Sequence, residues 1–200
     1  MEATWDVIMF MICVRRNNIL KIYSTFFPEV KIIEYDKETD NRGFSYSIYN
    51  RTEMENAGIF FEYKEERIYY SKKAGTLYGI HFQNNPKPQS KLLYCIEGRG
   101  IDYAIDLRKN SSTYLKWICV ELSVENRKQI YIPKGFGHVF ISLEDNTRNV
   151  MRFDESFDSR YSRQIAYNDP DIGIDYPIQN LILAPHDINA TFLSESDLNL

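Results

Sequence analysis

The chain has 200 residues and a formal net charge of −4, so it can bury the core of one domain and lacks the basic excess of a nucleic-acid-binding surface. Hydrophobic residues make up 44% of it, and it contains 15 tyrosines and 12 phenylalanines but only nine glycines and seven prolines. Because aromatic residues favour pleated, half-buried strands, this composition predicts a β-rich protein. The negative net charge predicts that nucleic acid is not a partner.

The chain begins with an apolar run, WDVIMFMICV, at residues 5–14. The run is too short to cross a bilayer and no basic stretch precedes it, so it predicts neither a membrane anchor nor a secretory signal. We expect residues 1–20 to be an extension or a strand ahead of the core, and residues 21–200 to form a single domain. The cysteines have no CxxC spacing, which indicates reduced thiols in a cytoplasmic protein; they are Cys13, Cys95 and Cys119.

One short helix is predicted in the first half of the chain. In TEMENAG, residues 52–58, Thr52 is followed three positions later by Glu55, and the stretch closes on Gly58. This is the pattern of a capped helix, and it predicts Thr52 as the capping residue.

Alternation with a period of two dominates the rest of the chain. Residues 101–108, IDYAIDLR, predict a strand with one apolar and one polar face, on which Asp106 and Arg108 would form a surface ion pair worth little. The turn at residues 97–100 predicts a hairpin between this strand and the apolar run before it. Short strands about ten residues apart, punctuated by glycine and proline, predict a mainly β jelly-roll sandwich or barrel.

The sequence contains no GxGxxG, phosphate-loop or GxSxG pattern, so dinucleotide, phosphate-loop and serine-hydrolase chemistry have no basis in it. The chemically versatile residues that remain are three histidines, His81, His138 and His186. A single histidine in a β protein more often has a satisfied structural place than a chemical role. The histidines alone therefore leave the function open.

Four stretches occur in a characteristic order: DNRGF, GTLYGIHFQ, the segment from Gln89 to Phe140, and NDPDIGIDYP. In these stretches and their spacing the chain, from about Val30 to Asp187, resembles the dTDP-4-dehydrorhamnose 3,5-epimerase family of RmlC-like cupins, which act in nucleotide-sugar biosynthesis. The resemblance implies a jelly-roll cupin barrel with short peripheral helices and a homodimer that exchanges N-terminal strands. It also implies an activity that needs no metal and no organic cofactor.

The resemblance assigns roles to individual residues. His81 in GTLYGIHFQ would be the base that removes a proton next to a C4 ketone, and Asp187 in APHD would orient it. Lys91 would stabilise the enolate together with His138, the histidine of GFGHVF. Two further residues would bind the substrate: Arg42 of DNRGF the diphosphate, and Phe157 the thymine base by stacking.

Two departures from the family leave the activity open. Tyr78 stands where the family has an arginine near the substrate. Met151 stands where the family has the tyrosine that returns a proton from the opposite face, and a thioether cannot donate a proton. Tyr78 or another phenol could take over protonation, the enzyme could invert C3 or C5 alone, or the chain could be a binding paralogue without catalysis.

A metal-dependent cupin is the alternative from a different class. Such a site needs a His-x-His pair followed by glutamate, whereas His81 is followed by Phe82 and Gln83, and only His138 fits the second cupin motif. This ligand count predicts no metal. The expectation is a cytoplasmic, homodimeric isomerase that epimerises a dTDP-linked 4-keto-6-deoxyhexose in dTDP-rhamnose or related deoxysugar biosynthesis, for surface polysaccharides.

Overall fold

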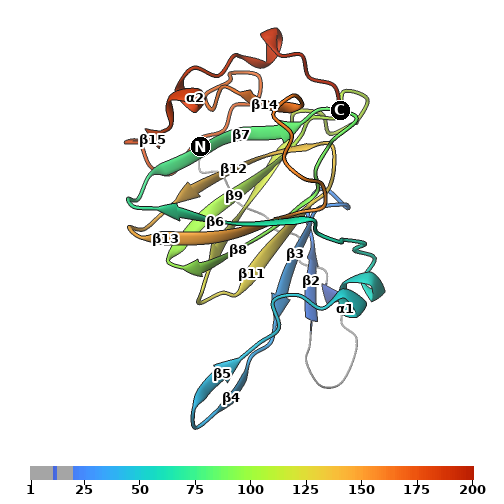
Figure 1. Cartoon of the computed structure of the whole chain (residues 1–200), viewed down its shortest axis with the longest axis vertical. Coiled ribbons are helices and arrows are strands. Elements are labelled where there is room, and N and C mark those ends of the chain that lie inside the picture. Colours follow the sequence, from blue (N-terminus) through green and yellow to red (C-terminus); the bar gives the residue numbers. More distant parts are fainter. Residues whose placement is uncertain (1–10, 13–19) are drawn as a thin grey trace.

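Two β-sheets packed face to face form the body of the protein (Figure 1). The computed structural model describes residues 11–12 and 20–200. The seven-stranded sheet has the order β1 (Met11–Ile12), β2 (Leu20–Ser24), β3 (Lys31–Tyr35), β11 (Lys128–Ile132), β8 (Lys91–Glu97), β13 (Thr147–Phe153) and β6 (Glu65–Ser71). The six-stranded sheet has the order β10 (Trp117–Ser123), β9 (Arg99–Asp106), β12 (Phe136–Ser142), β7 (Thr76–Gln83) and β14 (Ser162–Ile165), with β15 (Ile182–Leu183) parallel to β7. The predicted fold class, a mainly β jelly roll of the cupin type, is confirmed.

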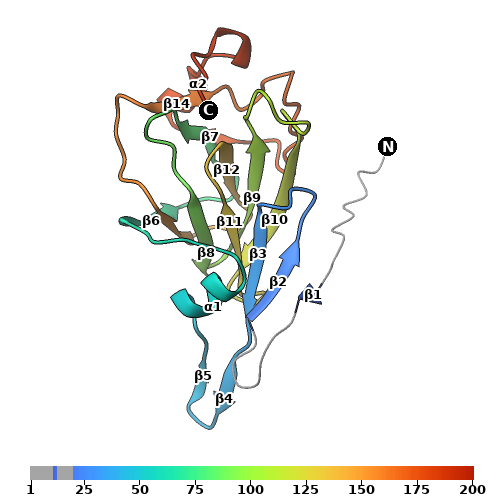
Figure 2. The same cartoon turned by 90° about the vertical axis from the view of Figure 1, so that its right-hand side faces the viewer.

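The smaller elements lie at the two ends of the sheets. A hairpin of β4 (Glu38–Asp40) and β5 (Gly43–Ser45) projects from one end (Figure 1), and the C-terminal segment crosses the other end near β7 and β14 (Figure 2). The helices are short: α1 (Arg51–Asn56), α2 (Pro185–Ile188) and the 3-10 helix η1 (Leu193–Glu195). In residues 11–12 and 20–200, no helix is long and apolar enough to span a membrane. Most of the predicted extension, residues 1–20, lies outside the described residues.

The six-stranded sheet is covered on both faces. Its inner face shares one core with the seven-stranded sheet, in which Ala104 and Phe140 meet Leu93 and Met151. Its outer face packs under the C-terminal segment, which contributes residues such as Ile172 and Leu198. Strand β9 therefore has no solvent face, although its sequence alternates as if it had one.

The predicted hairpin across residues 97–100 is wrong. Strand β8 pairs with β11 and β13 in the seven-stranded sheet, whereas β9 pairs with β10 and β12 in the six-stranded sheet. The chain passes from one sheet to the other at Gly98, whose φ is 66° and whose absent Cβ would lie 2.6 Å from Thr147 Oγ1. Glycine is required at this crossing because it alone tolerates both the conformation and the contact.

The predicted helix exists, but its cap is wrong. Helix α1 begins at Arg51, and Asn50 caps it by accepting a hydrogen bond at Oδ1 from the backbone N–H of Glu53, at 3.2 Å. Thr52 lies inside the helix. Asparagine and threonine are both good caps, so the composition of this stretch does not determine which of them starts the helix.

The predicted surface pair of Asp106 and Arg108 is also wrong, because Asp106 is completely buried. Its carboxylate accepts hydrogen bonds from the Arg108 backbone N–H, Nε and Nη2, and from the hydroxyls of Ser111 and Thr113. Burial alone would raise the pKa of Asp106, but these hydrogen bonds lower it to about 2. This cluster anchors the turn that follows β9.

Asp106→Asn should lower the free energy of unfolding at pH 7 by about 2 to 3 kcal/mol, the linkage value of a carboxyl whose pKa falls from about 4 to about 2 on folding. This stabilisation is present above the unfolded pKa and is lost as pH falls through the folded pKa. Urea unfolding of both proteins should therefore show a difference that shrinks toward pH 2. Glu144→Gln removes an exposed pair with Arg99 and should cost at most about 1 kcal/mol. Equal losses in the two variants would contradict this account.

Candidate active site

A cavity of about 370 Å³ opens between the two sheets. Strands β6, β8 and β13 form one wall, and β7, β12 and β14 form the other. The lining residues include all but two of the predicted site residues. Those present are His81, Lys91, His138, Tyr78 and Phe157; Asp187 lies behind His81, and Arg42 lies elsewhere.

A β-bulge brings Tyr78 and His81 to the same face of β7. Between the pairs His138↔His81 and Phe140↔Tyr78, β7 has one more residue than β12. This extra residue offsets the normal alternation, so two side chains an odd number of positions apart both line the cavity. Ile80, between them, packs in the outer core.

A partly exposed His81 and a buried Asp187 form a dyad. His81 Nε2 lies 2.7 Å from Asp187 Oδ1, and the Asp187 side chain is only 2% exposed. Burial raises the pKa of this carboxyl, but the hydrogen bond and charge of His81, the charge of His186 and the backbone N–H of Gly79 outweigh it and lower the pKa. The ionised carboxylate holds the proton on Nε2 and leaves Nδ1 with its lone pair, which suits the imidazole to act as a base.

The dyad depends on Gly79. A Cβ at this position would lie 2.8 Å from Asp187 Oδ1. Gly79→Ala should displace the carboxylate and reduce the population of the Nε2–H tautomer of His81, which ¹⁵N NMR of labelled histidine measures. Gly137→Ala is a matched control, because its Cβ would meet Leu107 Cδ1 at the same 2.8 Å but not the dyad. An unchanged His81 tautomer in Gly79→Ala would show that the dyad accommodates the added methyl group, and that it does not depend on Gly79.

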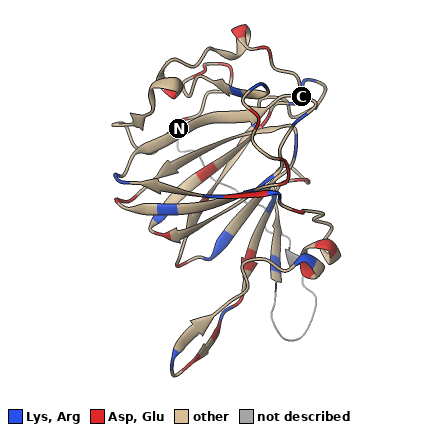
Figure 3. Cartoon of the chain, in the orientation of Figure 1, with Lys and Arg blue, Asp and Glu red and all other residues tan. Residues whose placement is uncertain are grey.

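Most charged residues lie on loops and strands with both signs interspersed (Figure 3), but Lys91, Asp102 and His138 form a buried polar cluster. Lys91 Nζ donates to the backbone carbonyl of His81 at 3.0 Å, and His138 Nδ1 lies 3.3 Å from Asp102 Oδ2. Burial lowers the pKa of Lys91 to about 7, against the opposing charge of Asp102. Burial also raises the pKa of Asp102 well above its ordinary value and, with the charges of Lys91 and His81, lowers that of His138. The cluster thus places an ammonium with a labile proton beside the base.

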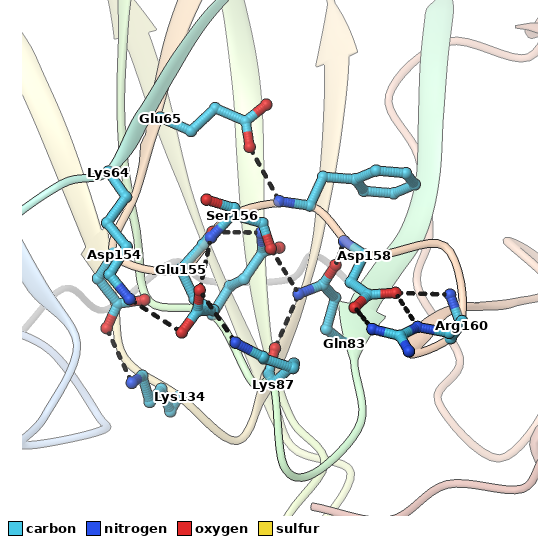
Figure 4. Close-up of polar contacts among 12 residues, drawn as sticks. Lys64, Glu65, Gln83, Lys87, Lys134, Asp154, Glu155, Ser156, Asp158 and Arg160 are labelled. Carbon is cyan, nitrogen blue, oxygen red and sulfur yellow. Dashed lines mark hydrogen bonds and ion pairs between the residues drawn. The ribbon is translucent and has the colours of Figure 1, made fainter.

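Phe157 lies at the rim of the cavity on a loop that Gln83 anchors. Figure 4 shows Gln83 between Ser156 and Asp158: its Nε2 donates to the Lys87 carbonyl at 2.7 Å, and its Oε1 accepts from the Asp158 N–H at 2.7 Å. The Phe157 ring is half exposed and lies 5.2 Å from the Arg67 guanidinium. An exposed aromatic face on a fixed loop can stack on a planar ligand group.

Arg42 lies apart from this cavity. It is in the turn of the β4–β5 hairpin, its side chain is 85% exposed, and its guanidinium pairs with Asp40. Within one chain, Arg42 therefore does not join the other predicted site residues.

The sequence-based interpretation gave no role to several cavity residues, among them Arg67, Tyr69, Asn149 and Gln164. The first two alternate along β6 with exposed Ile68 and Tyr70. This alternation is readable in EERIYYS, but nothing in the stretch says which face is covered.

One group of residues in the described part of the chain could hold a divalent cation. His81, His186 and Asp187 each offer a ligand atom, all within 4.8 Å of one another. This set includes His186 and excludes His138, on which the sequence-based ligand count rested. A cation bound here would compete for the His81 nitrogen that Asp187 holds, so dyad and cation are alternatives.

Comparison with known proteins identifies relatives of the chain. The family model described as dTDP-4-dehydrorhamnose 3,5-epimerase matches residues 24–195. A dTDP-4-dehydrorhamnose 3,5-epimerase of Shigella flexneri is 36% identical over 179 residues, which cover 89% of this chain and 98% of the relative.

Solved structures of epimerases are also similar to this chain. A dTDP-6-deoxy-D-glucose-3,5-epimerase from Legionella pneumophila, in complex with dTDP-4-keto-L-rhamnose, has a TM-score of 0.84 and 33% identity, covering 89% of this chain and 95% of that one. A 3'-monoepimerase from Streptomyces bikiniensis, in complex with dTDP-quinovose, has a TM-score of 0.80 and 27% identity, covering 86% and 87%. The similarity to both extends over nearly the whole described chain.

Proposed function

The chain belongs to the dTDP-4-dehydrorhamnose 3,5-epimerase family, and on that premise we propose that it inverts a carbon next to the C4 ketone of a dTDP-linked 4-keto-6-deoxyhexose. The observation that carries the proposal is the His81–Asp187 dyad, 2.7 Å apart, with Lys91 in the same cavity. A base, its orienting carboxylate and a cation in one partly apolar pocket are the groups that proton abstraction next to a ketone needs.

The reaction begins when His81 Nδ1 takes the proton. The electrons of the broken C–H bond form a C=C bond, and the carbonyl electron pair moves to oxygen, which becomes an enolate. The Lys91 ammonium offsets this negative charge. His138 also faces the cavity; a protonated Asp102 carboxyl would donate to His138 Nδ1 and leave Nε2–H as a second donor to the enolate oxygen. Phe157 and Tyr78 would bind the nucleotide and sugar from the rim and from β7.

The number of inverted carbons has two candidates. Most relatives are named for inversion at C3 and C5, while the similar Streptomyces bikiniensis protein is a 3'-monoepimerase. The second candidate is inversion of a single carbon. Met151 supports it, because a thioether cannot donate the proton that an inversion needs. A binding paralogue without catalysis is the alternative to both.

Solvent deuterium exchange into dTDP-4-keto-6-deoxyglucose, followed by NMR, tests the proposal. Exchange at C3 and C5 with inverted product at both carbons supports the double epimerase, and exchange with inversion at one carbon supports the narrower activity. No exchange at any enzyme concentration, combined with measurable dTDP-sugar binding, would leave only the binding paralogue.

We also propose that the enzyme works in the cytoplasm as a homodimer. The position of Arg42 supports the homodimer. Arg42 lies on a projecting hairpin away from the cavity of its own chain, so it can hold a diphosphate only in the cavity of a second copy. Light scattering should give twice the chain mass, and Arg42→Ala should raise KM for the dTDP sugar more than it lowers kcat. A monomer with full activity would exclude this role.

A further inference from the structure

An inversion needs a proton donor on the wall that faces the base. His81 lies on β7, in the six-stranded sheet, and takes its proton from one face of the sugar. The returning proton must reach the other face, which the seven-stranded sheet covers. Met151 occupies the middle of that wall, 3% exposed, and a thioether has no proton to give.

Two phenols line the cavity, Tyr69 and Tyr78, with ring centroids 5.4 Å apart in an edge-to-face contact. Tyr78 is on β7, the strand of the base, and its hydroxyl donates to the Tyr70 carbonyl at 3.4 Å. Tyr78 therefore stands on the same wall as His81 and would return a proton to the face from which it came.

Tyr69 stands on the opposite wall. It lies on β6, in the seven-stranded sheet, where its register partner on β13 is Asn149 and the partner of Arg67 is Met151. The Tyr69–Asn149 pair thus lies two residues along the ladder from the Arg67–Met151 pair, which puts the Tyr69 side chain on the same inner face as Met151. Burial raises the pKa of Tyr69, against the charge of Arg67, so the phenol keeps its proton at neutral pH.

Asn149 adds an independent sign that this wall meets a ligand. Its side chain is buried at 1% exposure, it lines the cavity, and its Oδ1 has no hydrogen-bond partner among the described residues. A buried acceptor without a partner destabilises the folded protein, so a bound hydroxyl donor would relieve this cost.

We propose that Tyr69 is the proton donor of this enzyme and that Asn149 Oδ1 accepts a hydrogen bond from a sugar hydroxyl, holding the enolate carbon toward Tyr69. The step rests on the proposed function. The Tyr69 O–H bond breaks, its proton bonds to the enolate carbon through the C=C electron pair, and the oxygen pair re-forms the ketone. The tyrosinate that remains lies beside the Arg67 guanidinium, and His81 keeps the proton it removed until solvent exchanges both.

The test separates deprotonation from inversion. In D₂O, Tyr69→Phe should still exchange the substrate proton through His81, while inverted product per exchange event falls by about 10²-fold or more, the usual contribution of a general acid. The matched control is Tyr70→Phe, which removes an exposed phenol from the outer face of the same strand and should keep the wild-type ratio of inversion to exchange. Tyr78→Phe tests the competing phenol, and it should keep this ratio even if KM rises. Adding Met151→Tyr to Tyr69→Phe places a phenol on the same wall and should restore part of the inversion.

The other outcomes would overturn either the assignment of Tyr69 or the proposed function. Inversion at the wild-type ratio in Tyr69→Phe, or loss of inversion in Tyr78→Phe, would overturn the assignment. A wild-type protein that exchanges but never inverts would reject Tyr69 as donor and leave the base assignment standing, whereas a wild-type protein that does neither would reject the proposed function itself. Asn149→Ala should raise KM with little change in kcat; an unchanged KM would remove Asn149 from the site.

Discussion

Replacement of His81 by asparagine should reduce solvent deuterium exchange next to the C4 ketone by about 10²- to 10⁴-fold, the range that a positioned general base contributes. Asparagine keeps a polar group near Asp187 but has no basic nitrogen, so the first proton cannot be removed. Exchange is the right measurement because it reports deprotonation even where inversion fails. NMR integration of the C3 and C5 protons over time gives the rate at each carbon.

Two controls make this result specific to the base. Asp187→Asn keeps the imidazole and loses only the carboxylate that fixes its tautomer, so exchange should fall less than in His81→Asn. His186→Asn removes an exposed histidine whose ring lies 5.8 Å from that of His81 and whose charge helps to keep Asp187 ionised, so exchange should fall less than in Asp187→Asn. If His81→Asn exchanged as wild type does, the base would have to be another residue.

Alternation along the chain was sufficient to predict a mainly β protein but not the pairing of its strands. In β9, Asp102 and Asp106 alternate with apolar residues just as they would in a strand with one solvent face. The C-terminal segment covers the outer, apolar face of this strand, and its aspartates turn inward. Because burial of both faces depends on residues far along the chain, local pattern could not reveal that β8 and β9 belong to different sheets.

The site, too, was predictable only in part from the sequence. His81 and Asp187 are 106 positions apart, and only the resemblance to a family joined them before the structure did so. The bulge that turns Tyr78 to the face of His81 cannot be read from a strand with regular alternation. Tyr69 was missed because its strand is rich in aromatic residues, and only the exposure of Ile68 and Tyr70 identifies its inner face.

Lys91→Met should lower kcat by about 10²- to 10³-fold, the usual effect of removing one donor to a developing oxyanion. In the wild type, burial lowers the pKa of Lys91 to about 7, so the ammonium is present below this pH and is lost as pH rises through it. We therefore expect kcat/KM, which reports the free enzyme, to decline on the alkaline side of about pH 7.

The profile of kcat/KM against pH, measured from about pH 6 to about pH 9, tests this assignment directly because that range brackets the titration. Lys87→Met removes a half-exposed lysine that pairs with Glu155 and does not line the cavity, so it should leave the alkaline decline in place. Thermal melting serves as the check on folding, because Lys91→Met removes one member of a buried polar cluster. A wild-type profile that stays flat across the alkaline range would mean that Lys91 keeps its proton, and that the neighbouring Asp102 charge outweighs burial in setting its pKa.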